Sequence, residues 1–84
     1  MKFNYSEQTI AIDNLARNIW KRRKAVRLTQ EMLAEKTEMS AQYIYLLENG
    51  KIQNPGIFTI KALADFFGCE IADMLSGKVE EVAS

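Results

Sequence analysis

The sequence predicts an all-α domain, a compact five-helix bundle, from three observations. Apolar residues recur at helical spacing in several separate segments, and no segment alternates as a strand would. Residues that favour helix starts precede these segments, and glycine or proline lies between or after them. Of the 84 residues, 48% are hydrophobic and only one is proline, so we expect a folded chain with one modest core.

The first helix is predicted from about Ile12 to Val26, after an N-terminal arm of residues 1–11. The arm mixes polar residues with apolar ones, so it is either frayed or stapled to the body by Phe3, Tyr5 and Ile10. The helix carries an apolar stripe of Ile12, Leu15, Ala16, Ile19 and Val26.

Arg23 occupies a place in that stripe where an apolar residue would be expected. A charge that is half inside a core is costly unless it is paired. The candidate partner is Glu48, near the end of the third helix.

The same helix has a basic side, with Trp20 among Arg17, Lys21, Arg22, Lys24 and Arg27. It is either a solvated face, a phosphate-contacting surface, or a basic amphipathic helix of the membrane-surface or calmodulin-target kind. Trp20 adjoins the apolar stripe, so we expect it to pack against the core, with a dimer contact as the second interpretation.

Residues 28–51 read as two short helices joined by a tight turn. Thr29 caps the first of them and Ser40 the second, because their hydroxyls accept from unpaired amides of the first turn. Residues 37–39 separate the two helices. The predicted buried side chains are Leu33 and Ala34 in the first and Ile44 and Leu47 in the second.

The second of these helices presents an outward face of Ala41, Gln42, Tyr45 and Leu46. A helix this short is not stable alone in water and must be docked on a core. A docked helix with outward side chains near its start is what a reader of the DNA major groove requires.

The remaining chain predicts a turn at Pro55-Gly56, a fourth helix from about Phe58 to Phe67 and a fifth from about Glu70 to Leu75. Gly68 ends the fourth helix. Ile60, Leu63, Ala64 and Phe67 fall on one face of the fourth helix, and the apolar residues of the fifth helix are Ile71, Met74 and Leu75. The domain is thus assigned to residues 12–77, followed by a short charged tail, 78–84.

The net charge of zero conceals an asymmetry. Residues 1–51 carry nine Lys/Arg against six Asp/Glu, and residues 52–84 carry two against five. Such a chain can present its positive half to a polyanion, although scattered surface charge is the simpler interpretation.

Composition also excludes several functions. With one cysteine and no histidine, zinc sites and nucleophile–imidazole pairs are not expected, and no cofactor or small-molecule ligand is evident. The single Cys69 fits a reducing, cytoplasmic location, and no apolar run approaches the roughly 18 residues of a membrane span. We expect neither an enzyme nor a membrane partner.

Four segments together resemble the lambda-repressor-like (Cro-type, XRE family) helix-turn-helix proteins: LTQEMLAEK, MSAQYIYLLENGK, NP and IKALADFFG. The resemblance covers about residues 12–77. It implies a bundle of mostly five helices, with the helix-turn-helix formed by the second and third. It also implies a transcriptional regulator of bacterial, phage or mobile-element origin that binds double-stranded DNA, usually as a homodimer.

The resemblance assigns roles at matching positions. Gln30, Ser40 and Tyr43 match positions that contact the DNA backbone, Asn49 and Lys51 match positions flanking it, and Arg23 and Glu48 match the family's structural ion pair. The positions that read base edges are matched by Ala41, Gln42 and Leu46, with Tyr45 beside them. The dimer surface of relatives is usually the fifth helix and tail, where Phe66 and Met74 are candidates.

The reading positions depart from the family's pattern. Only Gln42 can make a paired hydrogen bond to a base, favouring adenine, and Ala41 offers only a methyl group. Tyr45 and Leu46 either contact thymine methyls, bind a protein, or include one residue that a rotated helix buries. A protein-interaction module or antitoxin-like partner using the Tyr45/Leu46 face is therefore the alternative function. Two smaller departures are Glu38 at a turn position where relatives place glycine, and Glu70 where a serine or threonine cap is usual.

Overall fold

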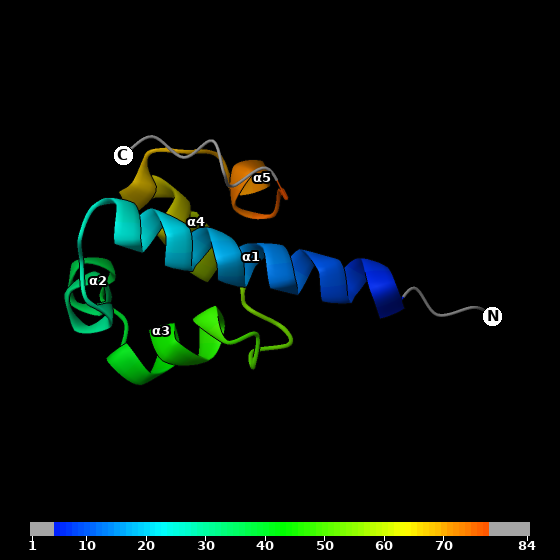
Figure 1. Cartoon of the computed structure of the whole chain (residues 1–84), viewed down its shortest axis with the longest axis horizontal. Coiled ribbons are helices and arrows are strands. Elements are labelled where there is room, and N and C mark those ends of the chain that lie inside the picture. Colours follow the sequence, from blue (N-terminus) through cyan, green and yellow to red (C-terminus); the bar gives the residue numbers. More distant parts are fainter. Residues whose placement is uncertain (1–4, 78–84) are drawn as a thin grey trace.

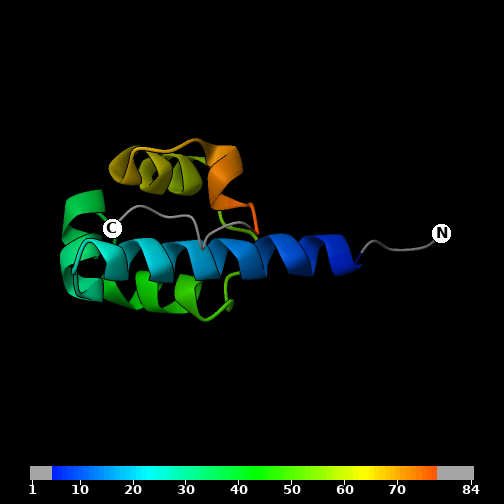
Figure 2. The same ribbon diagram turned by 45° about the horizontal axis from the view of Figure 1, so that its top comes forward.

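Helix α1 (Tyr5–Ala25) runs along the molecule, and the other helices pack around its C-terminal part (Figure 1). The structure is a computed structural model that describes residues 5–77. Within that range it contains five helices and no strand, as predicted. Helices α2 (Gln30–Thr37) and α3 (Ala41–Glu48) lie on one side of α1, while α4 (Ile57–Phe67) and α5 (Ile71–Met74) close the other sides (Figures 1 and 2).

The predicted start of α1 was wrong, whereas its end lies one residue from the predicted position. The helix begins at Tyr5 rather than near Ile12. Residues 5–11 contain no glycine or proline that would interrupt the helix. Ile10 belongs to this helix and is 57% exposed, so it does not staple an arm to the body. At the other end the helix stops at Ala25, and Val26 is 51% exposed rather than part of the core stripe. Residues 1–4 of the predicted arm lie outside the described residues.

The two predicted caps of the helix-turn-helix are confirmed. The Thr29 hydroxyl accepts from the Met32 amide at 3.0 Å, and the Ser40 hydroxyl accepts from the Tyr43 amide at 3.0 Å. Between the helices, Glu38 adopts a left-handed conformation with φ 59° and ψ 40°. The turn therefore requires a backbone conformation that glycine adopts at lower cost than glutamate.

Helices α4 and α5 end close to the predicted positions. Gly68 terminates α4 with φ 74°, and α5 is one turn long, with Glu70 and Leu75 as its flanking caps rather than as helical residues. The Asp73 carboxylate accepts from the Glu70 amide at 3.0 Å, which satisfies a donor at the start of α5. The predicted tail, 78–84, lies outside the described residues.

Every helix contributes a side chain with no exposed surface to one shared core: Ile19, Leu33, Ile44, Leu63 and Met74. Because each helix encloses the others' side chains, none of the short helices has to be stable alone. The burial of Met74 contradicts its candidacy as a dimer contact, whereas Phe66 is 37% exposed.

Asn18 is fully buried in α1, which the apolar pattern did not predict. Its amide donates to the carbonyl oxygens of Asn14 at 3.0 Å and Ser76 at 2.9 Å, and its oxygen accepts from Arg22 at 2.9 Å. The Asn14 amide donates to the Leu75 carbonyl at 3.0 Å. These amides hold the end of α5 against α1, because carbonyls after a last helical turn have no partner within the helix.

Candidate nucleic-acid interface

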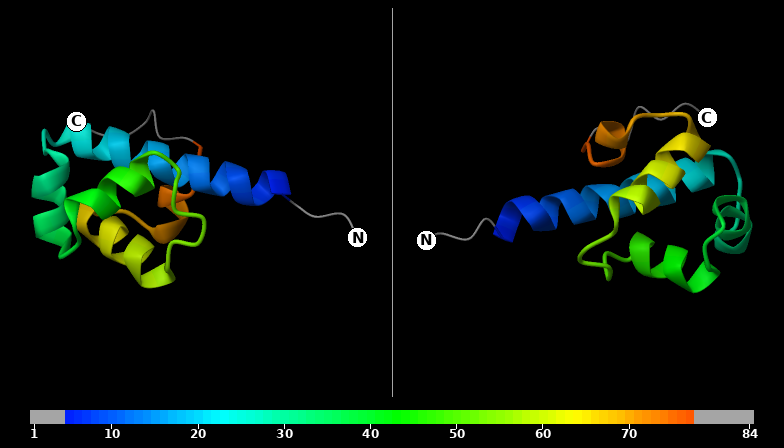
Figure 3. Two further views of the ribbon diagram at one scale, coloured as in Figure 1. Left: turned by 90° about the horizontal axis from the view of Figure 1, so that it is seen from below. Right: turned by 180° about the vertical axis from the view of Figure 1, so that it is seen from behind.

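Helix α3 forms one edge of the molecule, with one side in the core and the other facing out (Figure 1). Ile44 and Leu47 are buried, as predicted. The exposed residues at and after its start are Ser40, Gln42, Tyr45 and Asn49. This outward face is open in the view from below (Figure 3, left).

The predicted ion pair between Arg23 and Glu48 is confirmed. The Arg23 Nε atom lies 2.6 Å from Glu48 Oε2, and its Nη2 atom lies 3.0 Å from Oε1. The two side chains are only 10% and 3% exposed. The third guanidinium nitrogen, Nη1, donates to the Leu28 carbonyl at 2.8 Å. The pair therefore fixes the C-terminal end of α3 against both α1 and the segment that leads into α2.

Gln30 joins the same carboxylate. Its Nε2 atom donates to Glu48 Oε1 at 3.0 Å. The family resemblance places Gln30 at a DNA phosphate, and nothing in the sequence indicates this bond to Glu48. Since a side-chain amide has two N–H donors, one can remain on Glu48 while the other points to a further acceptor.

The residues at the start of α3 divide between packing and exposure. Ala41 and Tyr43 are half-buried and pack against the core cluster, whereas Gln42 is exposed. The oxygen of Ser40 is occupied as an acceptor by the Tyr43 amide, which leaves its O–H as a donor.

Tyr45 and Leu46 differ in exposure. Tyr45 is 53% exposed, whereas Leu46 is half-buried. The apolar surface at the centre of the outward face is therefore mainly the tyrosine ring, with the leucine at its margin.

Beyond α3, the Asn49 side chain donates to the Tyr45 carbonyl at 2.7 Å, and the Lys51 amide donates to the Leu46 carbonyl at 2.9 Å. These bonds satisfy carbonyls at the end of the helix. They also fix the backbone position of the exposed Lys51 relative to the end of α3.

The basic residues of α1 do not form one surface. Arg22 donates to the buried Asn18 and lies near Cys69, so it faces α5 rather than the outward side of α3. Burial raises the pKa of the Cys69 thiol, and the Arg22 charge acts in the opposite direction. Trp20 is 46% exposed, with Lys24 Nζ 5.8 Å from its ring centroid, so the predicted core packing of Trp20 was wrong.

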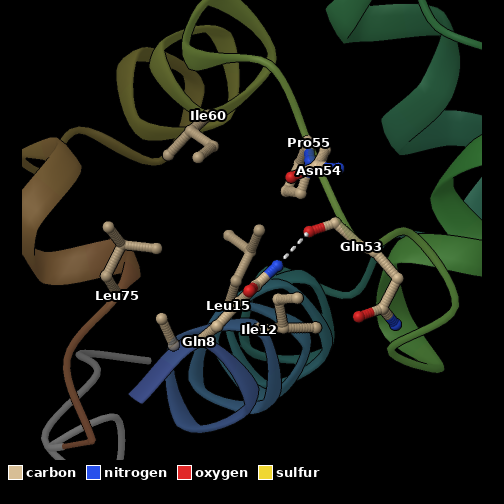
Figure 4. A pocket seen from close by; sticks show the side chains of 9 residues that line it. Gln8, Ile12, Leu15, Gln53, Asn54, Pro55, Ile60 and Leu75 are labelled. Carbon is tan, nitrogen blue, oxygen red and sulfur yellow. Dashed lines mark hydrogen bonds between the residues drawn. The ribbon is translucent and has the colours of Figure 1, made fainter. Parts of the chain in front are cut away.

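A hollow of about 380 Å³ lies between the N-terminal part of α1, the segment between α3 and α4, and the end of α5 (Figure 4). Ile12, Leu15, Ile60 and Leu75 form its apolar wall, and Gln8 bridges its mouth by donating to the Gln53 carbonyl at 3.4 Å. Its lining side chains carry no ionisable group, so it offers no acid, base or nucleophile.

Among residues 5–77, no helix combines the length and apolar character needed to cross a membrane.

Comparison with known proteins identifies the family. The helix-turn-helix family model matches residues 21–74, which include all of α2, α3, α4 and α5. No curated protein matches the chain significantly. A solved structure with a similar fold is that of hydroxypropylphosphonic acid epoxidase from S. wedmorenis, with a TM-score of 0.74 and 19% identity. The match covers 81% of this chain but only 36% of that one, and it shows the fold alone. The chain belongs to the lambda-repressor-like (XRE) family of helix-turn-helix DNA-binding transcriptional regulators.

Proposed function

We propose that this chain is a sequence-specific transcriptional regulator of bacterial, phage or mobile-element origin that binds double-stranded DNA as a homodimer, with α3 in the major groove. The observation that supports the proposal is that α3 has one side buried in the core and the other exposed. Ile44 and Leu47 are buried in the core, while Gln42 and Tyr45 stand exposed on the outward face.

Base contacts are assigned to the start and centre of α3. Gln42 is the paired hydrogen-bonding reader, and its side-chain amide suits adenine. Ala41 and Leu46 supply apolar contacts to thymine methyl groups, with Tyr45 beside them. Because Leu46 is half-buried, Tyr45 has the larger share of accessible apolar surface.

Backbone contacts fix the register of α3 on the duplex. We assign them to Gln30, Ser40, Tyr43, Asn49 and Lys51. The Glu48 carboxylate orients Gln30, so the ion pair that docks α3 also sets the position of a phosphate donor on α2.

A monomer of this size covers little DNA for tight specific binding, so we propose a dimer on a pseudo-palindromic site. Its half-sites would lie about one helical turn, roughly 34 Å, apart. Regulation would follow from occupancy of the site, without enzymatic activity and without a cofactor or small-molecule ligand, inside the cytoplasm.

The alternative is a protein-interaction module that uses the same outward face, favoured by the 53% exposure of Tyr45 next to Leu46. Salt dependence separates the two functions, because counterion release weakens DNA binding steeply with salt whereas apolar association is not weakened. We expect the chain to be retained on duplex DNA at low salt and released at moderate salt. No retention at low salt on any duplex would refute DNA binding.

A matched pair of lysine variants sharpens this test. Lys51→Ala should reduce the slope of log affinity against log salt by about 1, as loss of one phosphate contact does. Lys61→Ala, measured on a duplex that holds a single half-site, is the control, because Lys61 lies on α4 with its ammonium paired to Asp65 at 2.8 Å. Equal changes in the salt dependence for the two variants would show that Lys51 does not contact a DNA phosphate.

A further inference from the structure

Helix α4 has a second apolar face that the core does not use. Phe58, Ala62 and Phe66 follow one another at four-residue spacing, opposite the buried Ile60 and Leu63. Phe58 is 84% exposed, the most exposed large apolar side chain of residues 7–77, and Phe66 is 37% exposed. We name Phe58, Ala62 and Phe66 the α4 ridge. A large exposed aromatic side chain beside further apolar surface is typical of an interaction site.

We propose that the α4 ridge joins two copies of this chain. A two-fold interface brings the same patch of two copies into contact. The patch must therefore not carry an excess of one charge, which would repel the other copy. The charged side chains of α4 are Lys61 and Asp65, and they neutralise each other, with Lys61 Nζ 2.8 Å from Asp65 Oδ1. From residue 13 to residue 24, the exposed charged side chains of α1 are Arg17, Lys21 and Lys24 against Asp13, so this face keeps a net positive charge that disfavours its own copy.

The shape of the ridge also suits a second copy. Rows of residues four apart form the ridges that interdigitate in the commonest class of helix packing. Ala62 leaves a gap between two phenylalanine rings. An antiparallel copy of α4 would place its own rings around that gap, with the two-fold axis passing near Ala62.

The position of the ridge is compatible with DNA binding by both copies. Viewed from the side on which α3 is exposed, α1 and α4 form opposite edges of the molecule, with α3 between them (Figure 3, left). A two-fold axis along that line of sight, beside α4, leaves both α3 helices facing the same side. Both could then face one duplex.

The area of the ridge implies a weak dimer. A phenylalanine buries about 150–250 Å² when fully covered. Two partly exposed rings and the adjoining Ile57, 55% exposed, therefore fall short of the roughly 800 Å² per partner of a stable interface. We infer that two copies associate weakly alone and firmly when neighbouring half-sites hold them together. This part of the inference rests on the proposed DNA binding.

Cysteine cross-linking tests the interface without DNA. Cys69 is the chain's one cysteine, so Cys69→Ser provides a background in which Ala62→Cys is the sole thiol. In a disulfide the two Cα atoms lie roughly 4.4–6.8 Å apart. A residue near the two-fold axis can approach the same residue of the other copy to that distance. We expect faster oxidation to a covalent dimer than at an exposed position outside the interface. The control is Ile10→Cys in the same background, because Ile10 is 57% exposed on α1. Equal rates for both variants would mean random collision and would overturn the interface.

Phe58→Glu tests the interface on DNA, using duplexes with one or two half-sites selected from a random pool. We expect at least about tenfold weaker binding to two half-sites and nearly unchanged binding to one, because the link between copies is lost. Ile10→Glu is the matched control and should change neither. An equal loss on the single half-site would overturn the proposal, because it would place Phe58 at the DNA.

The two proposals fail separately. Binding of one half-site without cross-linking or cooperativity refutes the α4 ridge and leaves DNA binding intact. Selective cross-linking through Ala62→Cys without retention on any duplex supports the ridge and refutes the proposed function.

Discussion

Glu48 on α3 receives both Arg23 from α1 and Gln30 from α2, so one carboxylate joins the first three helices. Its side chain is 3% exposed, and the two bonds from Arg23 form a paired, charge-assisted contact. A buried pair of this kind fixes a single arrangement of the helices more than it adds net stability.

Arg23→Met should therefore destabilise the fold more than the double change Arg23→Met/Glu48→Leu. The single change leaves the Glu48 carboxylate buried without its cation, at a cost of about 3–5 kcal/mol, whereas the double change removes both charges. Urea denaturation of the three proteins measures the free energies of unfolding. Losses that simply add would show that the two side chains act independently.

Glu38→Gly should stabilise the protein by up to about 1 kcal/mol. Glu38 has φ 59°, where a side chain is strained and glycine is not. Glu35→Gly is the control, because Glu35 is exposed within α2 and glycine should cost about 1 kcal/mol there. Both midpoints can be read from thermal unfolding. A loss in both variants would contradict the strain at Glu38.

Asn18→Ala should loosen α5 from α1. It removes the donor to the Ser76 carbonyl and the acceptor for Arg22, so we expect a loss of about 1–3 kcal/mol. Hydrogen exchange should show faster opening of α5 than of α2, since Asn18 bonds to the segment after α5 and not to α2. Uniform acceleration across the molecule would instead indicate a general loss of stability.

Gln42→Ala should relax base preference at one position by about 1–3 kcal/mol and leave non-specific affinity nearly unchanged. Gln42 is exposed on the outward face of α3, so the fold should tolerate the change. Binding to a set of singly substituted duplexes is the measurement. A uniform loss across all of them would show that Gln42 does not read sequence.

Much of the fold follows from local chemistry in the sequence. The caps at Thr29 and Ser40, the helix end at Gly68 and the buried pairs of α2 and α3 depend on nearby residues, and all are as predicted. The Arg23–Glu48 pair was predictable because a charge stood in an apolar stripe.

The predictions failed for residues whose burial or contacts depend on segments that are distant in the sequence. Trp20 lies beside the stripe of α1 but remains 46% exposed, because none of the later helices within residues 5–77 covers that side. Asn18 is fully buried, because its amide meets carbonyls 58 residues further along the chain and within its own helix. Gln30 gave no signal of its bond to Glu48, since that contact depends on how α2 and α3 are placed.

The proposed DNA-facing positions of α3 differ in how freely they can be substituted, because some are exposed and others are half-buried. Gln42 and Tyr45 are exposed, so they can be exchanged for other residues with little loss of folding stability. Ala41 and Leu46 are half-buried, so a change there alters packing together with DNA contact. New binding specificities should therefore arise first at positions 42 and 45, while positions 41 and 46 change more slowly.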